Sequence, residues 1–170
     1  TAEHYGLTVR TVAADMRDLS VFEGLSFDIV DQPYSINFVP DCRDVFGEVA
    51  RLLRPGGRYR VVIANPLGMS VRQSDWNGDG YLIQGAYIDG ARISYADQDW
   101  VYDRNTGGDI PKPVEYRQSL SRVINGLIEC GFGIEHFAET VDLHPDTAAE
   151  PGSWDRYVAF VPPWFSILAR

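Results

Sequence analysis

The sequence predicts an α/β fold with a mainly parallel sheet, an antiparallel last strand and an antiparallel β insertion. Strand-like and helix-like runs alternate on both sides of residues 65–113, which is the pattern of parallel α/β sheets. Residues 65–113 are instead rich in Gly, Asp, Tyr and Trp and alternate in polarity, which favours antiparallel strands. The last two strand-like runs are joined without a helix, so we expect them to pair antiparallel.

Four elements are expected before the insertion. Residues 7–14 are rich in β-branched side chains and predict a strand. Residues 27–30, a short apolar run, predict a strand covered on both faces. A helix is expected over 41–53, because Asp41 can act as its N-cap and apolar residues recur at helical spacing. Arg54-Pro55-Gly56-Gly57 should end this helix and lead into a strand over residues 58–64.

Within the insertion, Asp89-Gly90 predicts a hairpin turn between alternating runs, and Trp100–Tyr102 predicts a further short strand. Val114–Cys130 then has an apolar face at helical spacing and predicts a second helix, with Gly131 as its stop. Strands are expected over Gly133–Thr140 and Tyr157–Val161, separated by a loop.

Composition limits the function. The chain has 170 residues, of which 45% are hydrophobic and 23% are charged, as in an ordinary globular domain. A formal net charge of −9 argues against nucleic acid or an anionic membrane as a partner. No apolar run is long enough for a membrane helix, and the first residues do not resemble a signal peptide. Cys42 and Cys130 are expected to be free thiols of a cytoplasmic protein.

No metal site is expected. The two cysteines and three histidines have no metal-ligand spacing. Asp75-Trp76-Asn77-Gly78-Asp79-Gly80 matches the opening of a calcium loop, but the twelfth position, which needs a bidentate carboxylate, is Ala86. We therefore interpret this segment as a polar turn.

The order of these landmarks resembles a known family. A strand ends in Ala14-Asp15-Met16-Arg17-Asp18-Leu19, and Phe27-Asp28-Ile29-Val30 follows. The capped helix then ends in Leu52-Leu53-Arg54-Pro55-Gly56-Gly57, and the second helix ends in Ile128-Glu129-Cys130-Gly131-Phe132. This is similar to the second half of a class I S-adenosylmethionine-dependent methyltransferase domain, especially the group that includes quinone-biosynthesis C-methyltransferases.

The resemblance implies a partial Rossmann-like, doubly wound fold. Residues 1–170 would be the C-terminal part of one methyltransferase domain, with 65–113 as a β-rich lid or substrate insertion. The family's glycine-rich Gly-x-Gly-x-Gly loop does not occur in these residues, so we expect it upstream. The family's strand order (third, second, first, fourth, fifth, seventh, sixth) would leave the strand at residues 7–14 without neighbours here. Such a chain must re-pair its strands, borrow them from a partner or belong to a longer protein, and we favour the longer protein.

The resemblance also implies a reaction. The protein would transfer a methyl group from S-adenosylmethionine to a small-molecule acceptor and release S-adenosylhomocysteine. One alternative is a catalytically silent methyltransferase-like subunit that acts by packing against another protein. A nicotinamide-dependent oxidoreductase is less favoured, because its glycine fingerprint is also absent from the sequence. The aromatic segment Pro162-Pro163-Trp164-Phe165 is expected at the sheet edge or in a homodimer contact.

Site residues follow from the resemblance position by position. Asp15 would accept a hydrogen bond from the adenine amine, unless it is only a turn or capping residue, and Met16 would contact the adenine ring. The segment after the Phe-Asp-Ile-Val strand would face the methionine part of the cofactor, with a backbone carbonyl holding the amino group. These cofactor-binding candidates are Asp15, Met16, Asp31, Gln32 and Pro33.

Aromatic residues are the candidates for binding the acceptor, with packing in the core or the hairpin as the alternative. They are Tyr34, Trp76, Tyr81, Tyr87 and Tyr116. A general base is needed only if the acceptor is a weakly acidic hydroxyl or amine. No spacing selects one base, so no catalytic residue is assigned among the candidates His144, Asp75, Tyr116 and Asp31.

Overall fold

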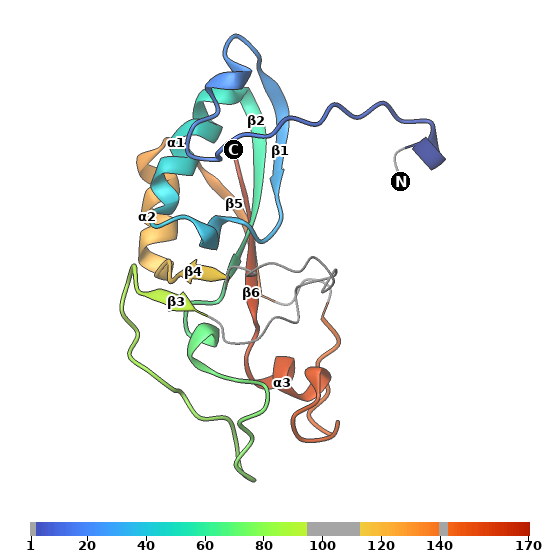
Figure 1. The fold of residues 1–170 in the computed structure, drawn as a ribbon, viewed down its shortest axis with the longest axis vertical. Helices are drawn as coiled ribbons and strands as arrows, with labels where there is room; N and C mark the ends of the chain where they lie inside the picture. Colours follow the sequence, from blue (N-terminus) through green and yellow to red (C-terminus); the bar gives the residue numbers. More distant parts are fainter. Residues whose placement is uncertain (1–2, 95–112, 140–142) are drawn as a thin grey trace, which may run out of the picture.

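The computed structural model describes residues 3–94, 113–139 and 143–170. Its centre is a four-stranded sheet in the order β1-β2-β6-β5 (Figure 1). β1 and β2 are parallel, whereas β6 is antiparallel to both β2 and β5. Three strands therefore share one direction, and the predicted mainly parallel sheet with an antiparallel last strand is confirmed. The strands are β1 (Phe27–Gln32), β2 (Leu53–Ala64), β5 (Ile134–Ala138) and β6 (Trp164–Ala169).

Two amphipathic helices, α1 (Cys42–Leu52) and α2 (Leu120–Glu129), lie side by side on one face of this sheet (Figure 1). The helix predicted over 41–53 is confirmed, and the carboxylate of Asp41 caps it by accepting the N–H of Arg43 at 3.0 Å. The core lies between the helices and the sheet. Its fully buried members include Phe46, Tyr59, Val61, Ile63, Val123, Leu127 and Ile167.

The segment Arg54-Pro55-Gly56-Gly57 ends α1 as predicted, but it also belongs to β2. Its four residues interrupt the register between β1 and β2, where Phe27 is opposite Leu53 and Ile29 is opposite Arg58. A side chain at Gly57 would meet the carbonyl oxygen of Asp28 at 3.2 Å, so glycine allows this close approach.

The helix predicted over 114–130 is shorter than expected. Val114–Tyr116 forms strand β4, which pairs antiparallel with β3 (Arg92–Ser94). The helix begins after Ser119, whose hydroxyl accepts the N–H of Arg122 at 3.2 Å. The buried amide of Gln118 donates to the carbonyl of Val39 at 2.8 Å and accepts the N–H of Cys42 at 3.3 Å. These bonds hold the chain to α1 and stop the helix from extending toward its N-terminus.

The hairpin predicted at Asp89-Gly90 is wrong. A turn does form there, with Gly90 at a φ of +72°, but the residues before it are not a strand. The carboxylate of Asp89 instead accepts hydrogen bonds from the N–H of Ser119 at 2.9 Å and from Arg122. The turn is therefore held to the start of α2. The strand predicted at Trp100–Tyr102 lies outside the described residues.

The end of the chain also differs from the prediction. Residues 157–161 are not a strand, because Trp154–Phe160 forms helix α3, capped by the hydroxyl of Ser153. The last strand is β6, and it begins at Trp164. The expected edge position of Pro162–Phe165 is wrong for Trp164 and Phe165, since β6 lies between β2 and β5. The strand predicted over 133–140 is confirmed as β5.

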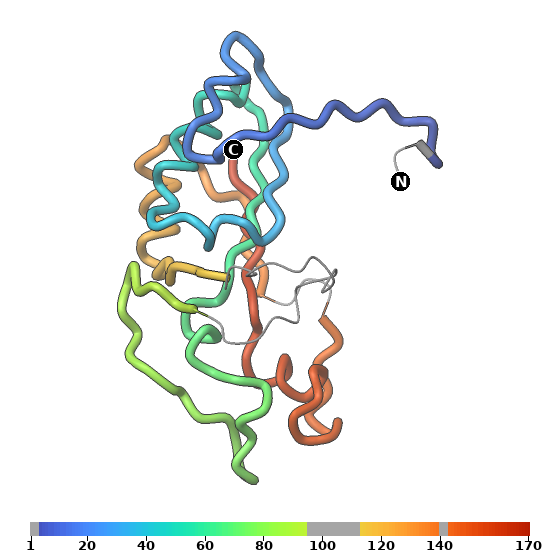
Figure 2. The backbone as a smooth tube through the Cα atoms, in the orientation of Figure 1, coloured from blue at the N-terminus to red at the C-terminus, as the bar shows by residue number. Residues whose placement is uncertain are grey.

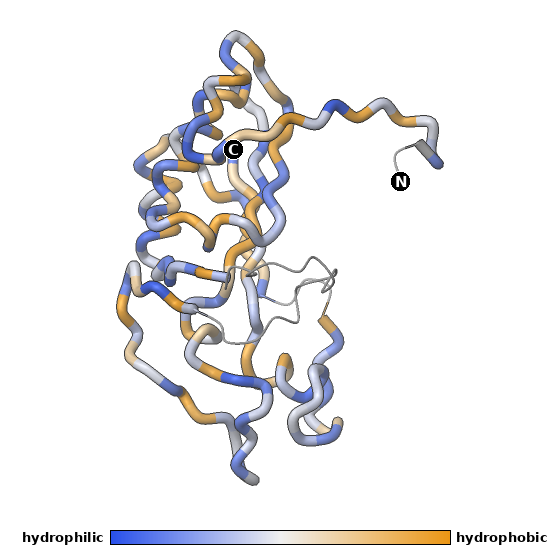
Figure 3. The backbone as a smooth tube through the Cα atoms, in the orientation of Figure 1, coloured by the Kyte–Doolittle hydropathy of each residue, from blue (hydrophilic) through white to orange (hydrophobic). Residues whose placement is uncertain are grey.

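Residues 7–14 do not form the predicted strand. They run away from the body of the molecule as an arm (Figure 2), and its hydrophobic positions are coloured orange in Figure 3. Leu7 and Val9 are each 63% exposed, and no described strand pairs with this segment. A strand needs a hydrogen-bonded neighbour, so β-branched composition alone is not sufficient. β1 is an edge strand of the sheet, and Ile29 is 67% exposed, so the expectation that β1 is covered on both faces is also wrong.

Short 3₁₀ turns complete the described elements. The turns are η1 (Glu3–Tyr5), η2 (Ser20–Phe22), η3 (Ile36–Phe38) and η4 (Gly68–Ser70).

No described helix has the length and apolar character needed to cross a membrane.

Candidate functional site

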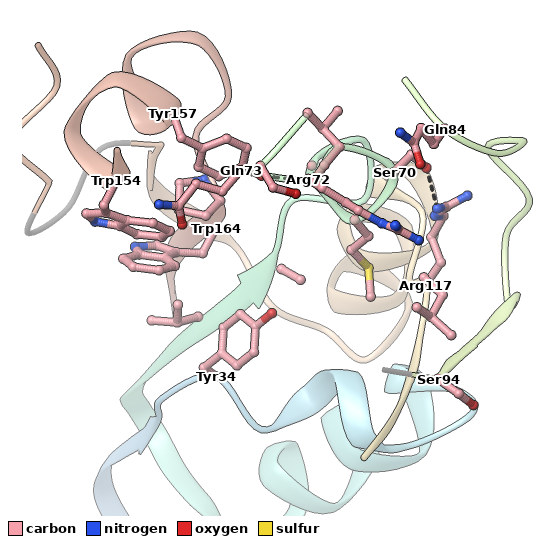
Figure 4. A pocket seen from close by; sticks show the side chains of 18 of the residues that line it. Tyr34, Ser70, Arg72, Gln73, Gln84, Ser94, Arg117, Trp154, Tyr157 and Trp164 are labelled. Carbon is pink, nitrogen blue, oxygen red and sulfur yellow. Dashed lines mark hydrogen bonds between the residues drawn. The ribbon is translucent and has the colours of Figure 1, made fainter. Parts of the chain in front are cut away.

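A cavity of about 1280 Å³ lies where the carboxyl ends of β1 and β2 meet the start of β6 (Figure 4). Pro33 and Tyr34 follow β1, Ala64 ends β2 and Trp164 begins β6, and all four line the cavity. Residues of the segment after β2, of β3 and of α3 complete the lining. Ligands of open α/β sheets bind outside the carboxyl ends of the parallel strands, so this cavity is the candidate site.

Tyr34 has an unusual backbone conformation at the edge of this cavity. Its φ is +34°, and it is the only non-glycine residue of the described chain with a positive φ. Its hydroxyl donates to a carboxylate oxygen of Glu115 at 3.4 Å, and its ring meets the edge of Trp164 with centroids 6.5 Å apart. Strained backbone of this kind occurs most often at functional sites, where surrounding contacts hold it in place.

A nearly buried arginine forms another part of the wall. Arg117, which follows β4, is 3% exposed and lines the cavity. Its guanidinium donates to the hydroxyl of Ser70 and to the carbonyl of Ala86 (Figure 4 shows the bond to Ser70). It also lies over the ring of Tyr87, at 5.7 Å from the ring centroid. The segment after β2 and the start of α2 are thereby joined at the cavity.

Aromatic side chains form the opposite wall in Figure 4. The indole rings of Trp154 and Trp164 lie 5.8 Å apart at an interplanar angle of 33°. Tyr157 packs on Trp154 with a ring distance of 5.8 Å. All three line the cavity, so this wall offers flat apolar surface to a ligand.

Two of the predicted cofactor-binding residues are in contact. The side-chain amide nitrogen of Gln32 lies 3.4 Å from the sulfur of Met16, and its amide oxygen accepts the hydroxyl of buried Tyr59. Gln32 is 9% exposed and ends β1, whereas Met16 is partly buried against the core. The structure therefore places Met16 beside the strand end that Pro33 follows, although only Pro33 of these three lines the cavity.

The other two predicted cofactor residues are held by arginines. The Asp15 carboxylate binds Arg17 at 2.6 Å, and these hydrogen bonds lower the pKa of Asp15 to about 2. Asp31 pairs with Arg60 at 2.9 Å on the exposed side of β1. Neither aspartate lines the large cavity. Asp15 borders a separate shallow hollow, together with Arg17, Asp18, Arg43, Asp44, Gly47 and Glu48.

Of the five aromatic residues predicted to bind the acceptor, Tyr34 alone lines the cavity. Trp76 and Tyr81 pack on each other with ring centroids 5.1 Å apart, and Tyr81 packs on Tyr157 at 5.4 Å. They therefore lie behind a residue of the cavity wall. Tyr87 does not line the cavity, and its ring packs against the guanidinium of Arg117. Its hydroxyl accepts the N–H of Leu120 at 3.3 Å. Tyr116, on β4, is half-buried away from the cavity.

None of the four candidate general bases lines the cavity. His144 is exposed, and the carboxylate of Asp75 accepts a hydrogen bond from the Gln84 amide. Among the described residues, no group of three or more His, Cys, Asp and Glu side chains could hold a metal ion.

The sequence did not predict Arg117, Trp154 or Trp164 as site residues, and Trp164 was expected only at the sheet edge or in a dimer contact. Arg117 lies within the run that was predicted as helix, where an arginine is unremarkable. A useful signal was Ser119, since a serine immediately before the helical apolar pattern that begins at Leu120 is an N-cap pattern that separates Arg117 from the helix.

Comparisons of the sequence with known proteins point to one family. The profile of the family described as "Methyltransferase domain" matches residues 1–61. A protein of Bacillus subtilis (strain 168), named as the uncharacterized methyltransferase YbaJ, is 32% identical over 150 residues. That match covers 81% of this chain and 52% of the relative, so the chain spans about half the length of the curated relative it matches.

Solved structures share the fold. An S-adenosylmethionine-dependent methyltransferase from Mesorhizobium loti superposes with a TM-score of 0.64 at 23% identity, over 92% of this chain and 67% of that one. Another, from Clostridium acetobutylicum ATCC 824, gives a TM-score of 0.64 at 18% identity, over 99% of this chain and 67% of that one. The predicted Rossmann-like α/β fold is confirmed.

Proposed function

We propose that this chain, which is similar to the methyltransferase-domain family, transfers a methyl group from S-adenosylmethionine to a small-molecule acceptor. The observation that carries this proposal is the cavity at the carboxyl ends of β1 and β2, with Pro33 and Tyr34 in its wall. This is the edge of the sheet where the fold class binds its ligands.

The residues at this edge fit the cofactor in part. Met16 and Gln32 are in contact beside the end of β1, so the proposed adenine and methionine sides of the site adjoin. Pro33 faces the cavity, and the backbone of Asp31–Pro33 would hold the methionine part. The carboxylate of Asp15 is paired with Arg17, so this exposed pair must open if Asp15 is to accept the adenine amine. Solvent screens an exposed ion pair strongly, so this opening costs little free energy.

The bound cofactor supplies a methyl group already activated by a sulfonium. The protein then has to hold the acceptor in line with it and exclude water. We assign this task to the segment 65–113, because Ser70 and its neighbours after β2, together with β3, line the cavity. Trp154 and Trp164 would hold the flat part of an acceptor. No described group is assigned as a general base.

A calorimetric titration of the protein with S-adenosylhomocysteine tests the proposal. Binding at one to one with micromolar or tighter affinity, about −8 kcal/mol, is the expected result. If a folded sample shows no binding, the chain is not itself a methyltransferase and the silent-subunit alternative replaces the proposal. Circular dichroism of the same sample shows whether it is folded.

A matched pair of variants locates the site. Tyr34→Ala removes the strained aromatic residue from the cavity edge, and we expect S-adenosylhomocysteine to bind about tenfold more weakly, as for a lost aromatic contact. Tyr5→Ala removes a tyrosine that is 75% exposed on the arm and should leave the affinity unchanged. If Tyr34→Ala and Tyr5→Ala lose the same affinity for S-adenosylhomocysteine, the cofactor does not bind at the cavity edge formed by Tyr34.

A further inference from the structure

The charges around the cavity oppose the charge of the whole chain. The chain has 24 Asp and Glu against 15 Lys and Arg, yet the described residues that line the cavity include four arginines and no carboxylate. Such a lining in a protein of net charge −9 favours a ligand that is itself negatively charged. The four arginines are Arg60, Arg72, Arg92 and Arg117.

Arg117 is the most constrained of these four. It is 3% exposed, and among the described residues it forms no ion pair. A guanidinium has five N–H donors, of which the hydroxyl of Ser70 and the carbonyl of Ala86 take two. Its Nε is buried and has no hydrogen-bond partner. The positive charge is therefore held in place by neutral oxygens and is not neutralised by them.

A buried charge of this kind is costly unless an opposite charge comes close to it. Arg60 has such a partner in Asp31 at 2.9 Å. Arg72 and Arg92 are exposed, and neither forms an ion pair with a described residue. Both line the cavity that Arg117 lines, so their positive charges add to its potential.

The two ends of the cavity differ in chemistry. In Figure 4, Trp154 and Trp164 lie on the side opposite to Arg117. Their rings present flat apolar surface, whereas guanidinium N–H groups match the oxygens of a carboxylate or phosphate. One ligand that reaches both ends would have a planar apolar part and an anionic group.

We infer that the methyl acceptor is a planar molecule with a carboxylate or phosphate group, and that Arg117 binds this anionic group. This inference rests on the proposed function, because only methyl transfer makes the bound molecule a methyl acceptor. The binding of the anion itself does not depend on the cofactor.

The test compares charged and neutral probes of one shape on the wild-type protein. Calorimetry with indole-3-acetate, indole-3-acetamide and 3-indolyl phosphate measures the three affinities. We expect an acid probe to bind at least about tenfold more tightly than the amide, because a charge-assisted hydrogen bond exceeds 1.4 kcal/mol. The stronger of the two acids distinguishes a carboxylate from a phosphate. Equal binding of indole-3-acetate and its amide, or no saturable binding of either acid, overturns the inference.

Variants then assign the anion to Arg117. Arg117→Gln should weaken the binding of the acid probe about tenfold and leave the binding of the amide unchanged. Arg54→Gln, which removes an exposed arginine paired with Asp28 outside the cavity, is the control and should change neither. If Arg117→Gln does not fold, Arg72→Gln in the same wall should weaken the acid by a smaller factor. Unchanged acid affinity in a folded Arg117→Gln protein overturns the assignment.

The failure of this inference can be separated from the failure of the proposed function. Titration with S-adenosylhomocysteine reports on the cofactor alone, and the acid–amide comparison reports on the cationic end alone. A protein that binds S-adenosylhomocysteine but does not distinguish acid from amide remains a methyltransferase candidate for a neutral acceptor.

Discussion

The amide nitrogen of Gln32 lies 3.4 Å from the sulfur of Met16, which ties the segment after residue 14 to the end of β1. The same amide donates to the hydroxyl of Ser35 at 3.1 Å and accepts the hydroxyl of Tyr59. A single buried side chain therefore joins β1, β2 and two loops next to the candidate cofactor site.

Tyr59→Phe should destabilise the protein by about 1–2 kcal/mol. The variant removes the hydroxyl that Gln32 accepts, and the amide oxygen is left buried without that donor. Urea unfolding followed by fluorescence measures the free energy. Tyr5→Phe, at a residue 75% exposed, is the control and should stay within about 0.5 kcal/mol of wild type. A Tyr59→Phe protein as stable as wild type would show that this hydrogen bond is not formed.

Two helical glycines should respond in opposite ways. At Gly47 on the exposed side of α1, an added Cβ meets no atom within 4 Å, so Gly47→Ala should stabilise by about 1 kcal/mol. At Gly126 on α2, an added Cβ would lie 2.8 Å from Cγ of Arg43 and 3.3 Å from the ring of Phe46. Gly126→Val should therefore destabilise by about 1–3 kcal/mol. Thermal unfolding measures both changes, and a stabilising Gly126→Val would contradict the close packing of α1 and α2.

The ion pair of Asp89 should make stability depend on pH in the acid range. Burial acts to raise the pKa of Asp89, but hydrogen bonds from Arg122 and Ser119 outweigh it and lower the pKa from 3.8 to about 2. The contribution of the Asp89 carboxylate to the free energy of unfolding is therefore complete above pH 4 and is lost as the pH falls through 2. The side chain is 38% exposed, so solvent screening limits this contribution to about 1 kcal/mol.

Asp89→Asn tests this pH dependence. The variant should be less stable than wild type at pH 7, and the difference should shrink between pH 4 and pH 2 when urea midpoints are compared. Asp79→Asn, in an exposed turn, should match wild type at every pH. A difference between wild type and Asp89→Asn that stays constant down to pH 2 would show that the carboxylate gains nothing from its partners.

The two thiols should react at different rates. Burial raises the pKa of Cys42 to about 12, and burial also raises the pKa of the half-buried Cys130. Iodoacetamide at pH 8 should therefore label Cys130 slowly and Cys42 only when the protein unfolds, because the thiolate is the nucleophile. Peptide mass spectrometry measures the labelling, with Cys130→Ser as control. Labelling of Cys42 at the rate of Cys130 in the folded protein would contradict its burial.

Local patterns were sufficient to predict the elements that face the core. The helical spacing of Val45, Phe46 and Val49 and the cap at Asp41 fixed α1, because both are properties of neighbouring residues. The antiparallel direction of the last strand was predicted correctly but on a wrong premise, because helix α3 lies between β5 and β6 where no helix was expected. The apolar run from Tyr157 to Val161 was misleading, because the capping hydroxyl of Ser153 favours a helix at the same place.

Residues whose roles depend on tertiary contacts could not be predicted. Arg117 has a role only because Ser70 and Ala86, 47 and 31 positions earlier, lie against its guanidinium. Trp154 and Trp164 meet because α3 folds back beside the start of β6. Only Pro33 and Tyr34 of the ten predicted site residues line the cavity, and both directly follow a strand that the sequence predicted well.

The interior place of β6 sets the order in which this sheet can be completed during synthesis. β6 is translated after every other described element, yet β2 and β5 meet only through it. While the residues of β6 are still in the ribosome, the edges of β2 and β5 that will pair with β6 have no hydrogen-bonding partner. A nascent chain halted before Trp164 would therefore expose two strand edges to other chains and depend on chaperones until the last strand is released.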